Sequence, residues 1–249
     1  MDIDALGLLL GAGFLGGIVN AVAGGATLLT FPAMLAAGLP PLTANASNAV
    51  AVAPGHLLAA AADAGRPRLG SPGAATLLAT ALAGGIAGAL LLLVTPPGIF
   101  LVFVPLLVGG ATALFAFAPL LVGGRPAGAR RRRSRVAVLL AASVYGGYFG
   151  AGLGVLLLAA VVLTGAEDGR TANACKNLLA ATVSLGTIAV FSLQGLVSWP
   201  ETTVMLAGAC AGGWVGGRLL PRLSAALVRR VVVGLGCVMT LVYALRYWG

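Results

Sequence analysis

Residues Asn20 to Pro32, NAVAGGATLLTFP, interrupt an otherwise apolar stretch with two adjacent glycines, an asparagine, two threonines and a proline. Gly and Pro weaken a helix, and unpaired polar groups are costly where water is absent. The surrounding sequence indicates such an environment, because no Asp, Glu, Lys or Arg occurs between Asp4 and Asp63. The stretch therefore predicts a break within a membrane-embedded helix.

The whole chain has the composition of a membrane protein. Of its 249 residues, 59% are hydrophobic and 8% are charged, whereas a soluble domain carries about 25% charged residues. A second uncharged run extends from Leu69 to Gly124. A bilayer core about 30 Å thick needs roughly 20 apolar residues as a helix, so each run has room for two or more crossings. We therefore expect an all-α, polytopic protein embedded in the lipid bilayer.

The net charge of +9 is concentrated in one connecting segment. Six of the 15 basic residues lie between Arg125 and Arg135. Lys and Arg gather in the short cytoplasmic loops of membrane proteins, so this charge indicates topology rather than nucleic-acid binding. We predict no nucleic-acid partner and a cytoplasmic linker at residues 125–135.

Glycines, prolines and charges divide the chain into eight hydrophobic segments. The first and fifth segments are too long for one plain crossing, and both contain glycine clusters. Each is predicted to be a broken or re-entrant helix, which is tolerated at membrane depth where protein or a water-filled cavity satisfies the backbone. The segments are 5–37, 43–62, 72–94, 98–122, 136–164, 171–193, 202–220 and 228–247.

The sequence contains an internal repeat. The string TANA occurs at Thr43–Ala46 and again at Thr171–Ala174, and each copy follows a Gly-Gly pair, Gly16-Gly17 or Gly146-Gly147. Two landmarks in the same order predict two related halves. We assign residues 1–122 to the first transmembrane repeat, 123–135 to the basic linker and 136–249 to the second repeat.

The loop charges predict that the two halves are inverted. In the first half the charged loop, with Arg66 and Arg68, follows the second segment. In the second half the arginines surround the last loop, and the loop before it carries only Glu201. The positive-inside rule then gives opposite orientations, as in many secondary transporters. Eight full crossings would instead give parallel repeats, so the number of crossings stays open.

Catalysis and metal binding are not predicted. All six carboxylates lie at segment ends or in loops, and His56 has no acidic neighbour on its helical face. No GxSxG, HExxH or P-loop pattern occurs. The cysteines Cys175, Cys210 and Cys237 have no metal-site spacing. We therefore expect a non-enzyme without a metal or cofactor.

Two glycine-rich breaks are candidates for an anion-binding site. A helix start exposed by a break offers N–H groups and the positive end of the helix dipole, and glycine lets a ligand approach the backbone closely. The alternative is that these glycines serve close helix packing. The candidate substrate-binding residues at the breaks are Asn20, Gly24, Gly25 and Thr27 in the first half and Tyr145, Gly146, Gly147 and Gly152 in the second.

The segments that begin with TANA add amides and one cation. Asn45 and Asn48 lie three residues apart, and Asn173 and Asn177 lie four apart, so each pair shares a helix face. Lys176 is the sole lysine of the chain. An ionisable residue within a membrane segment is a functional candidate, and its positive charge suits an anion. The alternative is that Lys176 snorkels to the interface.

The quoted segments resemble a known family. Residues 20–55 are similar to the first-repeat signature of the TauE/SafE sulfite exporter family, and YGGYFGAGLGVLLLAAVVLTG followed by RTANACKNLLAA is similar to the second. The resemblance covers nearly the whole chain. It implies a multi-pass protein of the bacterial inner membrane, with about eight segments in two repeats, that moves sulfite, sulfonates or related small anions.

We therefore predict a secondary transporter of a small sulfur-containing or carboxylate anion that works by alternating access between two repeats. Its partners would be the anion and the bilayer, and a homo-oligomer is compatible with the sequence. One alternative is a membrane interaction or assembly protein without transport, which predicts a dry centre at the breaks, whereas transport predicts a polar cavity. The other is a transporter of an unrelated solute such as a metal cation, for which intramembrane acidic ligands are lacking.

Overall fold

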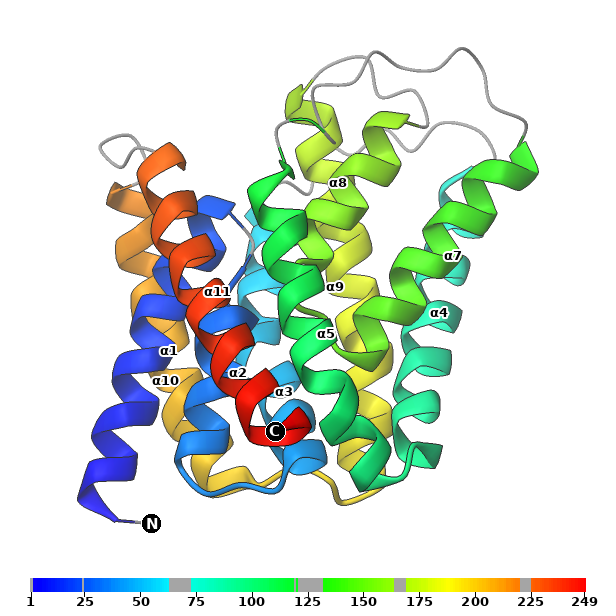
Figure 1. The fold of residues 1–249 in the computed structure, drawn as a ribbon. Coiled ribbons are helices and arrows are strands. Elements are labelled where there is room, and N and C mark those ends of the chain that lie inside the picture. Colours follow the sequence, from blue (N-terminus) through cyan, green and yellow to red (C-terminus); the bar gives the residue numbers. More distant parts are fainter. Residues whose placement is uncertain are drawn as a thin grey trace.

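The computed structural model describes residues 2–23, 25–62, 73–118, 120, 132–163, 169–219 and 225–249, and these residues form a bundle of helices (Figure 1). The first half contributes α1 (Ile3–Ala23), α2 (Thr27–Ala36), α3 (Pro41–Ala62), α4 (Ala74–Val94) and α5 (Pro97–Ala116). The second half contributes α7 (Arg132–Tyr148), α8 (Leu153–Leu163), α9 (Gly169–Leu193), α10 (Trp199–Leu219) and α11 (Ala225–Trp248).

Five of the described helices are long and apolar enough to cross a bilayer. These spans are Ile3–Ala21, Ala74–Val94, Pro97–Ala116, Thr171–Leu193 and Arg229–Trp248. The helices α3 and α10, which are not among these spans, are comparably long, at 22 and 21 residues. The prediction of an all-α, polytopic membrane protein is confirmed.

The first and fifth predicted segments are broken. The first consists of α1 and the 10-residue α2, and the fifth consists of α7 and the 11-residue α8. At 1.5 Å per residue, α2 and α8 are each about 15 Å long, roughly half the apolar thickness of a bilayer. Gly150 and Gly152 both have φ +76°, a left-handed conformation that favours glycine. The second break therefore depends on its glycines.

Figure 1 shows where the chain reverses. The N terminus, the C terminus and the connections α2–α3, α4–α5 and α9–α10 lie toward one end of the bundle, which we call the terminal end. The helix ends that border residues 63–72, 121–131, 164–168 and 220–224 lie at the other end. We call it the basic end, because α7 begins there with Arg132 and α10 ends there with Arg218 in its last turn. The first helices of the two halves, α1 and α7, therefore run in opposite directions, which supports the predicted inversion.

In two places a helix of one half packs against a helix of the other half, through the second glycine of each Gly-Gly pair. The helix α1 packs on α10, and α7 packs on α4. A Cβ atom on Gly17 would overlap the carbonyl oxygen of Ala209 in α10, and a Cβ on Gly147 would overlap that of Gly85 in α4. Each pair of helices thus approaches backbone to backbone, the small-residue packing that stabilises membrane helices.

The first glycine of each pair faces the half-length helix of its own half. A Cβ on Gly16 would lie 2.6 Å from Thr30 Cγ2 in α2, and a Cβ on Gly146 would lie 2.6 Å from Leu153 Cδ1 in α8. The same two contacts therefore recur in both halves. This recurrence supports the predicted internal repeat.

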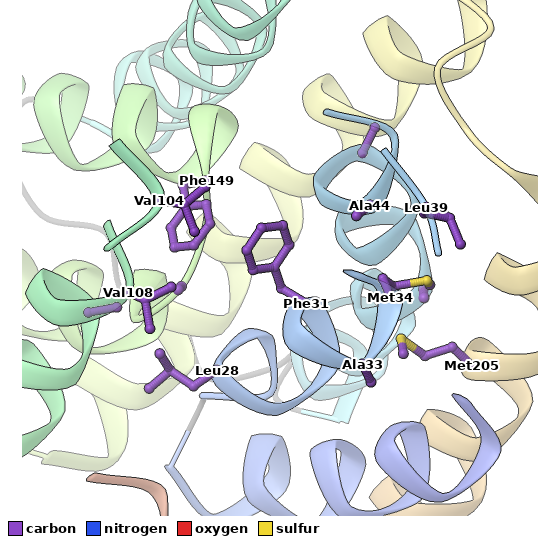
Figure 2. Packing of buried hydrophobic residues seen from close by; sticks show 14 of the residues in the cluster. Leu28, Phe31, Ala33, Met34, Leu39, Ala44, Val104, Val108, Phe149 and Met205 are labelled. Atoms are coloured by element: carbon purple, nitrogen blue, oxygen red, sulfur yellow. The ribbon is translucent and has the colours of Figure 1, made fainter. Parts of the chain in front are cut away.

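Aromatic side chains fill the space between the two breaks. Phe31 on α2 packs edge-on against Phe149 in the second break, with ring centroids 5.3 Å apart, and both rings are buried (Figure 2). Phe115 of α5 lies against Gly25, where a Cβ would overlap its ring. The centre between the breaks is therefore apolar and packed.

Candidate functional site

A cavity of about 500 Å³ lies next to the first break. It is lined by the last turns of α1, the second half of α3, the first turns of α9 and the second half of α10. All four segments belong to the part of each helix nearest the basic end. The cavity thus lies toward the basic end and uses helices from both halves.

Four polar side chains line the cavity. Asn20 comes from α1, whereas Asn173, Lys176 and Asn177 come from the first turns of α9. Asn173 is exposed, Lys176 is half-buried and Asn177 is 8% exposed, so the α9 residues extend from the mouth inward. Among the described lining residues, Lys176 is the one with a formal charge. The cavity therefore offers amides and a positive charge.

A glycine on α3 makes room for Asn20. A Cβ on Gly55 would lie 2.5 Å from Asn20 Nδ2, so the amide lies directly against the backbone of α3. Gly17, which precedes Asn20 by three residues on α1, also lines the cavity. Close approach of α1 and α3 thus places Asn20 at the wall.

The remaining wall is largely apolar. Val52, Leu58 and Trp214 contribute side chains to it. The Trp214 ring is 63% exposed, and the guanidinium of Arg218 lies 3.5 Å from the ring centroid. Apolar walls with a few placed polar groups are typical of small-molecule sites.

A second group of candidate residues is buried away from this cavity, between α2 and α3. Asn48 Nδ2 donates to Thr27 Oγ1 at 3.3 Å, and Thr30 Oγ1 donates to Asn48 Oδ1. All three side chains are at most 7% exposed. The structure therefore separates Thr27 and Asn48 from Asn20 and the α9 residues.

Asn45 joins α3 to the end of α7. Its Nδ2 donates to the carbonyl oxygen of Tyr148 at 2.8 Å. Its Oδ1 is buried, with no hydrogen-bond partner in the described part of the chain. Asn45 also lies outside the described cavity lining.

The break residues of the second half have structural contacts. Tyr145 donates its hydroxyl to the Ala151 carbonyl at 2.8 Å across the break. Gly146 and Gly147 pack against helices as described above, Gly25 packs under Phe115, and Gly152 lies near Leu114 of α5. These contacts match the alternative interpretation of close packing. Gly24 lies outside the described residues.

Sequence reasoning missed Trp214 and Gly55 as cavity residues. One signal was present for α10, because Gly208, Gly212 and Gly216 recur every four residues, which predicts a face for close helix packing. A Cβ on Gly212 would overlap the Phe14 carbonyl oxygen of α1. This contact holds α10 against α1, so that Trp214 lines the same cavity as Asn20.

Comparisons with known proteins agree over nearly the whole chain. The family model "Sulfite exporter TauE/SafE" matches residues 9–243. A "Probable membrane transporter protein" of Haemophilus influenzae is 30% identical over 248 residues, 96% of this chain and 94% of the relative. The "Probable membrane transporter protein YfcA" of Escherichia coli K12 is 30% identical over 94% of this chain and 88% of its own. No solved structure matches the chain.

Proposed function

The chain belongs to the sulfite exporter TauE/SafE family, and on that premise we propose that it is a secondary transporter which moves a small anion through the cavity between α1, α3, α9 and α10. The substrate class is sulfite, a sulfonate or a related organosulfur or carboxylate anion. Asn20, Asn173, Lys176 and Asn177 bind it in this conformation.

One observation carries the proposal: the cavity lining combines a lysine and two amides from α9 with a third amide, Asn20, from α1. Amide N–H groups and an ammonium are hydrogen-bond donors, and oxyanions are acceptors. The site thus has the charge and the donors that a sulfite, sulfonate or carboxylate group requires.

The two alternatives fit less well. A metal cation would meet a lysine as the charged group of the described lining, whereas cations prefer carboxylate, imidazole or thiolate ligands. An assembly protein predicts a dry centre, and the aromatic packing between the breaks has that character. The cavity beside the first break, with its lysine and three amides, favours transport.

The arginines support an orientation in the membrane. Arg132, Arg218, Arg229 and Arg230 all belong to turns near the basic end. Positive residues favour the cytoplasmic side, so we place the basic end and linker 125–135 in the cytoplasm of a bacterial inner membrane. The cavity in this conformation then lies on the cytoplasmic side.

Flux into proteoliposomes tests the proposal, with sulfite, a sulfonate, a small carboxylate and a divalent cation as solutes. We expect flux of at least one anion and none of the cation. Gly55→Leu should block this flux, because its side chain would fill the wall at Asn20. Gly234→Leu is the matched control, since a Cβ on Gly234 meets nothing within 4 Å. Absence of flux for every anion, or equal flux in both variants, would contradict the proposal.

A further inference from the structure

The two TANA segments occupy the same position in their helices but have different surroundings. Thr43 and Thr171 are each the third residue of a helix, α3 or α9. On α9 the residues after this threonine line the cavity. On α3 the corresponding Asn45 and Asn48 are each 1% exposed. We call the α9 copy, which borders the cavity, open and the buried α3 copy closed.

Hydrogen bonds hold the α3 copy closed at the terminal end. Asn45 bonds the Tyr148 carbonyl at the end of α7, and Asn48 bonds Thr27 and Thr30 on α2. The N–H group of Ser198, next to the start of α10, donates to Ser47 Oγ at 2.9 Å. The start of α3 is therefore tied to three other elements.

The closed copy retains one unused polar atom. Asn45 Oδ1 is buried without a hydrogen-bond partner among the described residues. A buried acceptor left unpaired is costly and rare. Asn45 therefore has hydrogen-bonding capacity that this conformation does not use.

The recurring glycine contacts suggest how the copies could exchange roles. The pairs α1–α10 and α4–α7 meet at backbone distance through Gly17 and Gly147, so each pair can move as one body. The helices α3 and α9, which pack on each other, also contact α10 and α4 respectively. A rocking motion that closes the start of α9 would then open the start of α3.

We propose that Thr27, Asn45 and Asn48 form a second substrate-contact site, closed in this conformation, that opens toward the terminal end when the described cavity closes. This inference rests on the proposed function, and it adds which residues receive the anion on the opposite face. Opening breaks the bonds of Asn45 to Tyr148 and of Ser47 to Ser198. It frees the Asn45 amide and exposes Asn48, whose present partners are Thr27 and Thr30, so that the substrate can contact both amides, as we propose for Asn173 and Asn177 at the basic end.

Thiol protection in proteoliposomes tests the opening. Ser47→Cys, in a variant with Cys175, Cys210 and Cys237 replaced and flux verified, is exposed to a membrane-impermeant maleimide at the terminal end. We expect protection at rest and modification during anion flux. Thr203→Cys is the accessible control, because Thr203 is exposed near the start of α10. Ser143→Cys is the protected control, because Ser143 is 0% exposed beside Gly84 in the α4–α7 pair.

Side-specific kinetics test the role of the amides. Asn45→Ala should raise the KM for anion supplied at the terminal end and leave the KM at the basic end nearly unchanged. Asn177→Ala should do the reverse. A purely structural role for Asn45 would lower the amount of folded protein or alter both sides together.

The outcomes separate the two proposals. Wild-type flux with Ser47→Cys protected throughout, or an equal KM increase on both sides for Asn45→Ala, overturns the second site and leaves the proposed function standing. Absence of wild-type flux for every anion overturns both.

Discussion

Replacing Lys176 by methionine should weaken anion binding strongly without unfolding the protein. Methionine is also unbranched and fills a similar path along the cavity wall, so the change removes mainly the ammonium group. Lys176 is the charged residue of the described lining, and the variant leaves Asn20, Asn173 and Asn177 as donors. The formal charge contributed by these four side chains falls from +1 to zero.

The size of the effect follows from the hydrogen bond that is lost. A hydrogen bond to a charged group contributes about 1.5–3 kcal/mol. Since about 1.4 kcal/mol corresponds to a tenfold change in Kd, the Kd should rise roughly 10- to 150-fold. The full Coulomb energy of a buried pair does not apply, because Lys176 is half-buried and water screens the charge.

The assay uses the cavity-lining Trp214 as a reporter. Trp199 and Trp248, which lie outside the described lining, are replaced by phenylalanine, and fluorescence is followed while anion is added. Lys176→Arg keeps the charge and should keep most of the affinity, whereas Arg246→Gln changes an exposed arginine near the C terminus and should have no effect. A Kd for folded Lys176→Met within about twofold of wild type, below 0.5 kcal/mol, would refute an ionic role for Lys176.

Three further outcomes are expected. Arg218→Gln should raise the KM for anion supplied at the basic end at low ionic strength. Added salt should reduce the difference in KM from wild type, because exposed charges act through screened attraction. A KM equal to that of wild type at all salt concentrations would exclude this electrostatic steering. Gly88→Ala should lower the free energy of unfolding in detergent by about 1–3 kcal/mol, since its Cβ would overlap the Val144 carbonyl oxygen. The control Gly110→Ala, with open space around its Cβ, should be neutral or stabilising. Thr30→Val should cost about 1–3 kcal/mol by leaving Asn48 Oδ1 buried and unpaired, and an unchanged melting temperature would count against that bond.

The fold class and the helix breaks were predictable because their causes are local. A long uncharged run identifies a membrane segment from its own composition. Gly150 and Gly152 could be recognised as break residues because only glycine adopts their positive φ at little cost. The repeat could be predicted because TANA follows a Gly-Gly pair in both halves of the chain.

The grouping of the candidate residues was decided by the tertiary structure. Helical periodicity predicts that Asn173 and Asn177 share a face, but it does not say which neighbouring helix covers that face. Packing of α1 on α10 and of α9 on α3 brings Asn20 to the α9 residues across the two halves. The same motif on α3 is covered by α2 and the end of α7, and its amides bond to those elements. By itself the sequence determined the membrane class, the breaks and the polar residues, whereas contacts between distant helices decided which of those residues form a cavity.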